Sequence, residues 1–219
     1  MLTFRARGVR SKSSRLKSGC QLLAYSEFTV FESRGKYRID ESVPIALFLP
    51  IRDDIELLSL ASYAAQVAEV LSQEDCPGAD LLLLCLHTLQ ALSDHKRPQA
   101  LIKASFELRA ACLAGYTPVL DGCTICGIRS PDRFHVSGGV LQCAGCLQPD
   151  DTGIRLPLQP GTLDAMRYVT ACPVRKLFSF ELGEQALKQF ADVAETYLLT
   201  QLERGFFTLD FYKSLKYCT

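Results

Sequence analysis

Residues 121–146 read DGCTICGIRSPDRFHVSGGVLQCAGC and hold two Cys-x-x-Cys pairs, Cys123 with Cys126 and Cys143 with Cys146. Sixteen residues separate the two pairs. Two residues between cysteines allow a tight turn that points both sulfurs at one place, and two such turns supply the four thiolates of a closed zinc site. The sequence therefore predicts one structural Zn²⁺ ion bound by these four side chains.

The segment between the pairs is expected to form a β-hairpin. Two short runs that favour strands, Arg133–Val136 and Val140–Gln142, flank Ser137-Gly138-Gly139, whose composition is typical of a turn. A hairpin joining two cysteine turns is the arrangement of a zinc ribbon, which is predicted at about residues 121–148.

Other uses of the cysteines must be weighed against zinc. A thioredoxin-like redox motif would open a helix within a βαβ unit, and neither pair is predicted to do so. A catalytic zinc site keeps one position open for water, and the deaminase signature H-x-E with P-C-x-x-C is absent. His135 remains an alternative ligand in place of one cysteine. The other cysteines show no paired spacing and are expected to be ordinary thiols: Cys20, Cys76, Cys85, Cys112, Cys172 and Cys218.

Apolar residues that repeat about every 3.6 residues predict helices before and after the cysteines. The first begins with Asp53 as its cap and Glu56 three residues later, and it presents one apolar stripe. The most apolar run, Ala79–Leu92, is interrupted by polar residues and is shorter than the roughly 20 residues that span a membrane, so we expect a buried core helix. Helices are predicted at 53–71, 79–93, 98–115, 162–171 and 184–204.

The amino-terminal residues show the alternation of β-strands. Strands are predicted at Leu2–Arg7 and at Phe28–Phe31, with a hairpin turn at Ser33-Arg34-Gly35 and a flexible loop at residues 8–17. Residues 1–18 contain no acidic residue and six cations: Arg5, Arg7, Arg10, Lys12, Arg15 and Lys17. Mobile cations interleaved with serine hydroxyls can contact a phosphate backbone without recognising the bases. This composition therefore predicts a DNA-binding surface. The alternative is a solvated basic loop.

The composition of the whole chain indicates a folded protein of one or two domains. It has 219 residues, 48% of them hydrophobic, and no net charge. The charge is unevenly distributed, because residues 41–110 carry ten acidic and five basic residues, which suggests partners different from those of the amino terminus. The first residues lack the apolar region of a signal peptide, so a cytoplasmic protein with reduced thiols is expected.

The sequence carries no recognisable catalytic motif. Walker, nucleophile-elbow, H-E-x-x-H and dinucleotide-binding glycine patterns are all absent from it. The three histidines, His87, His95 and His135, suit helix-surface or core positions better than the role of a general base. The sequence therefore predicts a protein that is not an enzyme.

Three segments of the chain resemble the RecO family, the bacterial mediators of recombinational DNA repair. Residues 2–17, LTFRARGVRSKSSRLK, are similar to the third strand and basic loop of the family's amino-terminal OB-fold. Residues 106–127, from FELR through AGYTP to CTICG, resemble the helix that leads into its zinc knuckle. Residues 204–211, RGFFTLDF, resemble its carboxy-terminal segment.

The resemblance implies an α+β fold that is mostly helical. A partial OB-fold-like β domain would occupy residues 1–50, and a helical domain with the inserted zinc ribbon would occupy residues 51–219. The OB-fold is expected to be partial, with exposed sheet edges, because family members carry about two further strands before the position of Leu2.

The resemblance also implies a function. A protein of this family binds single- and double-stranded DNA, anneals strands and loads recombinase onto strands coated by single-strand-binding protein. Its implied partners are that coating protein and RecR, its place is the bacterial cytoplasm at the nucleoid without membrane contact, and the six cations fall on the family's basic loop. The alternatives are a zinc-ribbon module that binds a protein partner without direct DNA binding, and a thiol oxidoreductase.

Overall fold

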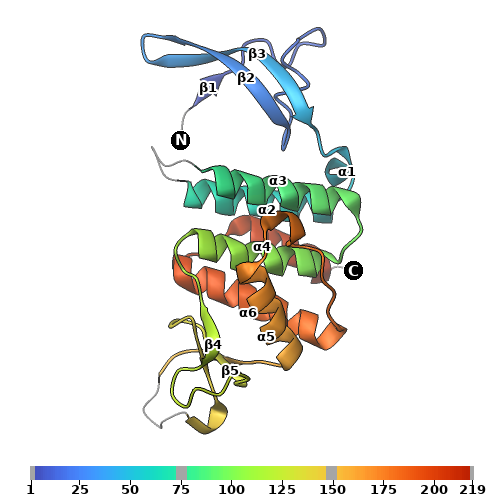
Figure 1. The fold of residues 1–219 in the computed structure, drawn as a ribbon. Coiled ribbons are helices and arrows are strands. Elements are labelled where there is room, and N and C mark those ends of the chain that lie inside the picture. Colours follow the sequence, from blue (N-terminus) through green and yellow to red (C-terminus); the bar gives the residue numbers. More distant parts are fainter. Residues whose placement is uncertain (1–2, 73–77, 147–151, 218–219) are drawn as a thin grey trace.

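The computed structural model describes residues 3–72, 78–146 and 152–217. Its elements form three parts that follow one another along the molecule (Figure 1). A three-stranded sheet lies at one end, a block of helices forms the middle, and a second sheet of four strands lies at the other end. The fold is mixed α+β with about half of the chain in helices, so "mostly helical" overstates the helical share.

The amino-terminal sheet has the strand order β1–β3–β2. β1 (Phe4–Arg5) pairs in parallel with β3 (Lys36–Ala46), and β2 (Tyr25–Ser33) pairs antiparallel with β3. The predicted hairpin is confirmed: Arg34 and Gly35 form a two-residue turn in which both have positive φ, 53° and 70°. The first strand is shorter than predicted, and Leu2 lies outside the described residues.

The basic segment between β1 and β2 is folded into consecutive turns. Its backbone N–H groups bond to carbonyls three residues earlier, as from Ser14 to Ser11 at 3.2 Å. Leu16 is buried, and its carbonyl accepts a hydrogen bond of 3.3 Å from the Ser42 hydroxyl on β3. The segment is therefore attached to the sheet, in contrast to the flexible loop that the sequence predicts.

The described residues of the helical block form α1 (Leu49–Arg52), α2 (Ile55–Leu71), α3 (Ala79–Asp94), α4 (Gln99–Leu113), α5 (Pro160–Ala171), the short 3₁₀ turn η2 (Val174–Lys176), α6 (Glu184–Leu202) and α7 (Phe207–Tyr217). The five helices predicted from periodicity are confirmed as α2 to α6, with no end shifted by more than two residues. α7 was not predicted.

Two predictions about these helices need correction. The cap of α2 is Asp54, not Asp53, because Asp54 Oδ1 accepts hydrogen bonds from the backbone N–H groups of Glu56 and Leu57 at 2.8 and 3.1 Å. The apolar α3 is buried on one side only, since Leu82 and Leu83 are 49% and 43% exposed. Periodicity does not reveal this, because these leucines are as apolar as the buried ones.

α4 is the central helix of the block and contains a buried ion pair. Lys103 Nζ lies 2.8 Å from Glu107 Oε1, and the two side chains are 6% and 0% exposed. Glu195 of α6 contacts the same ammonium at 2.7 Å, and the Tyr63 hydroxyl of α2 donates to Glu107 at 2.8 Å. The network thus joins three helices through polar contacts inside an apolar core.

The second sheet has the order β4–β6–β5–β7, and its strands are β4 (Val119–Cys123), β5 (Arg133–His135), β6 (Val140–Gln142) and β7 (Arg155–Pro157). The predicted hairpin between the cysteine pairs is confirmed as β5 and β6, which pair antiparallel. None of the helices in the described ranges combines the length and apolar character needed to cross a membrane.

Candidate functional site

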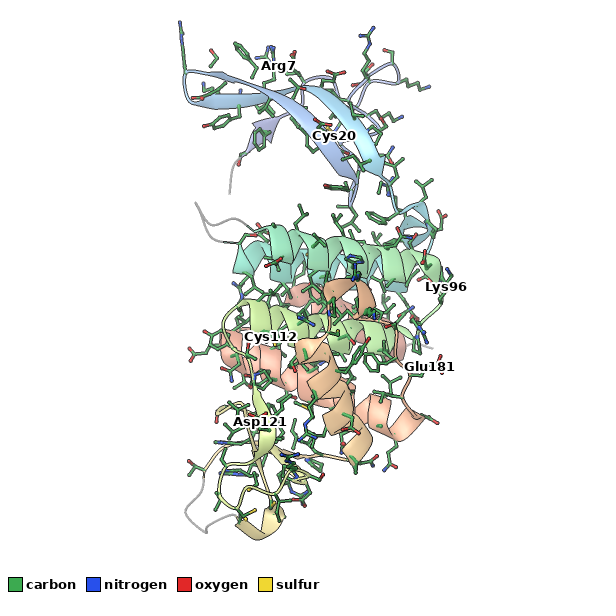
Figure 2. The ribbon with its side chains drawn as sticks, in the orientation of Figure 1. Arg7, Cys20, Lys96, Cys112, Asp121 and Glu181 are labelled. Atoms are coloured by element: carbon green, nitrogen blue, oxygen red, sulfur yellow. The ribbon has the colours of Figure 1, made fainter. Side chains whose placement is uncertain are left out.

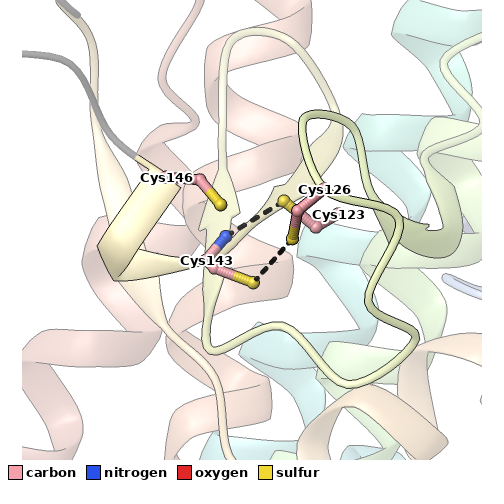
Figure 3. A group of neighbouring side chains, drawn as sticks. All are labelled: Cys123, Cys126, Cys143 and Cys146. Atoms are coloured by element: carbon pink, nitrogen blue, oxygen red, sulfur yellow. Dashed lines mark hydrogen bonds between the residues drawn. The ribbon is translucent and has the colours of Figure 1, made fainter.

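The four predicted ligands meet at one point beside the second sheet (Figure 3). Their Sγ atoms all lie within 4.8 Å of one another, and Cys126 Sγ is 3.7 Å from Cys143 Sγ. Four thiolates at 2.3 Å from a tetrahedral ion would be separated by about 3.8 Å. The donor set and its spacing therefore fit a metal ion, and these four cysteines can hold one.

Local hydrogen bonds shape the first turn, which begins where β4 ends. The N–H of Cys123 donates to the carbonyl of Ile128 at 2.8 Å, and the N–H of Gly127 donates to the carbonyl of Cys123 at 2.9 Å. Gly127 has a φ of +76°, which an L side chain rarely adopts. At Gly122 a Cβ would lie 2.9 Å from the Ile128 carbonyl, so the two legs of the turn approach closely.

The second turn follows β6 and includes the 3₁₀ turn η1 (Ala144–Cys146). The N–H of Cys146 donates to the carbonyl of Cys143 at 3.0 Å. Asp132 steadies this turn from the neighbouring segment, because its carboxylate accepts a 2.7 Å hydrogen bond from the N–H of Ala144. Each pair of sulfurs is thus presented by a turn whose backbone is already hydrogen-bonded.

The thiols of Cys123, Cys143 and Cys146 differ in how readily they ionise. Hydrogen bonds from the backbone N–H groups of Cys126 and then Ile125 and Cys143 lower the pKa of Cys123 to about 6, against the opposing effect of burial. Burial and the neighbouring sulfurs raise the pKa of Cys143 to about 12. The hydrogen bond with Cys126, together with burial, raises the pKa of Cys146 to about 11. Negative charge is therefore costly to accumulate here without a cation.

Other candidate ligands and thiols lie apart from this cluster. His135 Nε2 is 3.0 Å from the Ser137 hydroxyl, and His135 is not among the metal-binding group of the described residues. Cys85 and Cys112 are on the helices, where burial raises the pKa of each thiol, to about 11 for Cys85. Cys76 and Cys218 lie outside the described residues, as do positions 147 and 148 of the predicted ribbon.

The six predicted DNA-binding cations are all exposed, but the structure divides them. Arg5 and Arg7 lie beside the β2–β3 hairpin, whereas the other four belong to the turns between β1 and β2. Arg5 and Arg7 line a pocket of about 370 Å³ together with hairpin residues that the sequence alone does not assign to DNA binding: Phe31, Ser33, Arg34, Lys36, Tyr37 and Arg38.

This basic pocket combines cations with aromatic rings. The guanidinium of Arg38 lies over the Phe31 ring, and the rings of Phe4 and Tyr37 are 5.6 Å apart at an angle of 57°. Within the described residues Arg38 pairs with Asp40 at 3.0 Å, and no ion pair engages the pocket's other cations, Arg5, Arg7, Arg34 and Lys36. The sequence does contain a signal for this site, because residues 34–38 read RGKYR, a basic run with an aromatic residue inside it.

The basic pocket and the cysteine cluster lie at opposite ends of the molecule. Figure 2 shows Arg7 beside the amino-terminal sheet and Asp121, two residues before the first cysteine of the cluster, on the far side of the helical block. One small ligand therefore cannot contact both sites at once.

Comparison with known proteins gives a consistent family. Residues 52–210, which include α2 to α6 and the four clustered cysteines, match the family described as "Recombination protein O C terminal". The chain is 33% identical to the DNA repair protein RecO of Acetivibrio thermocellus over 96% of its own length and 84% of the relative. Similar relatives are the RecO proteins of Rubrobacter xylanophilus, 30% identical over 84% of this chain and 75% of the relative, and of Alkaliphilus metalliredigens, 26% identical over 91% and 81%. The chain therefore belongs to the RecO family of DNA repair proteins.

Proposed function

We propose that the chain is a DNA-binding recombination mediator that anneals strands and helps to load recombinase onto single strands coated by single-strand-binding protein. The basic pocket carries this proposal, because it joins cations that form no ion pair with any described residue, Arg5, Arg7, Arg34 and Lys36, to aromatic rings on an exposed sheet. Cations neutralise phosphates, and aromatic faces stack with bases of any identity. This combination supports binding of single strands without sequence preference.

The DNA-binding surface in this proposal has two parts. Arg5, Arg7, Arg34, Lys36 and Arg38 form the pocket, and the turns that carry Arg10, Lys12, Arg15 and Lys17 extend the positive charge along the same sheet. Residues 1–50 then act as an OB-fold-like DNA-binding domain, and residues 51–219 as a helical domain with a zinc ribbon.

In the proposed role, the four-cysteine site holds one structural zinc ion. Cys123, Cys126, Cys143 and Cys146 are the ligands, and the ion, when bound, supplies folding energy to the two turns that carry them. Four protein ligands leave no position for a reacting water, which supports a role without catalysis. We expect RecR and single-strand-binding protein as partners at the nucleoid, and we assign them no residues.

The proposal is tested by annealing of complementary strands coated with single-strand-binding protein. A triple variant, Arg5→Glu, Arg34→Glu and Lys36→Glu, reverses charge in the pocket, and Arg175→Glu, Lys176→Glu and Lys188→Glu makes the same change at exposed positions of the helical block. We expect the first variant to lose most of the annealing rate and the second to keep it. Equal rates for the wild-type protein and the pocket variant would instead favour a module that binds protein partners only.

A further inference from the structure

Arg167 on α5 donates hydrogen bonds to three backbone carbonyls of the cysteine-bearing segment, residues 119–146. No other described side chain outside this segment bonds to three of its carbonyls. Its Nε donates to the carbonyl of Leu120 at 2.9 Å. Its Nη2 donates to the carbonyls of Arg129 at 2.6 Å and Asp121 at 3.4 Å. One guanidinium is therefore bonded to three backbone carbonyls of the segment.

These carbonyls bracket the first cysteine turn. The chain passes Leu120 and Asp121 on its way into the turn and passes Arg129 on its way out, and Cys123 and Cys126 lie between them. The two legs are also close at Gly122 and Ile128, because a Cβ on Gly122 would lie 2.9 Å from the Ile128 carbonyl oxygen. The Arg167 side chain, which belongs to the helical block, thus holds the two ends of the turn together by bonding to both of them.

We infer that Arg167 is a positioning residue for the metal centre, which holds Cys123 and Cys126 in the binding arrangement before the ion arrives. This inference rests on the proposed zinc site. A planar guanidinium with fixed N–H directions can bond several carbonyls at once, whereas the ammonium of lysine is a compact charge on a flexible stem. The role therefore depends on the shape of the arginine fork as well as on its charge.

The same geometry links the metal to the helical block. If Arg167 favours the closed turn and the ion favours the closed turn, each strengthens the other by the same factor. Residues that orient metal ligands from outside the coordination sphere change metal affinity by about 10- to 100-fold when they are removed. We expect a loss in that range for Arg167→Ala, and for Arg167→Lys a loss nearly as large.

Two other side chains provide controls. Gln201 of α6 also attaches the segment to the helices, because its Nε2 donates to the carbonyls of Val136 and Ser137 at 3.0 and 3.3 Å, but these lie in the β5–β6 hairpin and not at a cysteine turn. Arg175 is an exposed arginine on η2. Gln201→Ala tests loss of docking in general, and Arg175→Ala tests loss of one positive charge.

The experiment measures the Zn²⁺ dissociation constant of the full chain by competition with a chelating dye, and helical content by circular dichroism. We expect Arg167→Ala and Arg167→Lys to bind Zn²⁺ about 10- to 100-fold more weakly with unchanged helicity, and both controls to bind within a factor of about three of the wild-type protein. Wild-type affinity in Arg167→Ala, full rescue by lysine, or an equal loss in Gln201→Ala would each overturn the inference while leaving the zinc site in place. A wild-type chain that binds no Zn²⁺ would overturn the proposed site itself.

Discussion

The guanidinium carbon of Arg38 lies 5.6 Å from the centroid of the Phe31 ring, and the two residues face each other across the β2–β3 hairpin. This cation–π contact fixes an arginine and an aromatic ring side by side at the edge of the basic pocket. The ring is 56% exposed, so one part of it remains available to a base.

Replacing Phe31 by alanine should weaken binding of single-stranded DNA by roughly 5- to 150-fold, because stacking on an aromatic side chain contributes about 1–3 kcal/mol per base. The loss should be similar for different sequences. Fluorescence anisotropy with labelled oligonucleotides measures it, and Phe207→Ala, which removes a 72% exposed ring on α7, is the matched control. Equal affinities for both variants would show that Phe31 does not stack with bases.

The buried ion pair of α4 predicts an asymmetric mutational response. Lys103→Met leaves the Glu107 carboxylate buried without its cation and should lower the free energy of unfolding by about 3–5 kcal/mol. Adding Glu107→Leu should restore most of that loss, because an apolar pair replaces the stranded charge. Urea denaturation of the single and double variants measures both values. A double variant less stable than the single one would contradict this account of the pair.

The same network gives a pH dependence through Glu195. Partial burial alone would raise the pKa of this carboxyl, but the nearby ammonium groups of Lys103 and Lys213 outweigh burial and lower it. A lowered pKa in the folded state stabilises the protein above the unfolded value of about 4.3, and this contribution is lost as the pH falls through the folded pKa.

We therefore expect Glu195→Gln to lower the melting temperature at pH 7. We also expect the melting temperature of this variant to fall less steeply than that of the wild-type protein as the pH drops below about 4.3. Glu107 affects the pH dependence in the opposite sense, because burial raises the pKa of its carboxyl. Since Glu107 is present in both proteins, its effect cancels in the comparison. Melting temperatures of the two proteins between pH 7 and pH 3 check this. Parallel curves over that range would show that Glu195 gains no stability from its ammonium partners.

Removal of the metal should unfold the cysteine-bearing segment and spare the helices. Metal binding to such sites contributes on the order of 10 kcal/mol or more of folding energy, and residues 124–130 of the first cysteine turn are all exposed, so burial does little to hold this turn. The purified chain should carry close to one zinc ion, and after chelation residues 121–146 should become open to protease while helical circular dichroism persists. Protection of this segment without metal at neutral pH would contradict a structural zinc.

The sequence correctly predicts those features of the structure that depend on the spacing of nearby residues. The Cys-x-x-Cys pairs, the hairpin between them and the five longest helices depend on residues that are close in the chain, and the structure contains those turns, that hairpin and those helices. The cap of α2 was misplaced because Asp53 and Asp54 are adjacent and chemically equal. α7 is only eleven residues long and is rich in phenylalanine and tyrosine, which also favour strands, so its sequence does not by itself indicate a helix.

Long-range contacts account for what the sequence does not reveal. The basic pocket exists because β1 pairs in parallel with β3, which brings Arg5 and Arg7 beside a hairpin turn that lies about thirty residues later. Arg167 meets the cysteine turn from a helix that follows it in the chain. Neither contact produces a periodicity or a residue spacing in the sequence, so each can be recognised only in the three-dimensional structure.

The salt dependence of single-strand affinity tests the central claim, that the amino-terminal sheet binds DNA through phosphate contacts. With three to five contacts, log affinity should fall with log salt at a slope of roughly −2 to −3.5, because each contact contributes about −0.7. Reversing charge at Arg5, Arg34 and Lys36, or separately at Arg10, Lys12, Arg15 and Lys17, should lower affinity for all sequences and make the slope shallower, with zinc content and helicity unchanged. A slope near zero in the wild-type chain, or slopes and affinities that neither set of substitutions alters, would contradict DNA binding by this sheet.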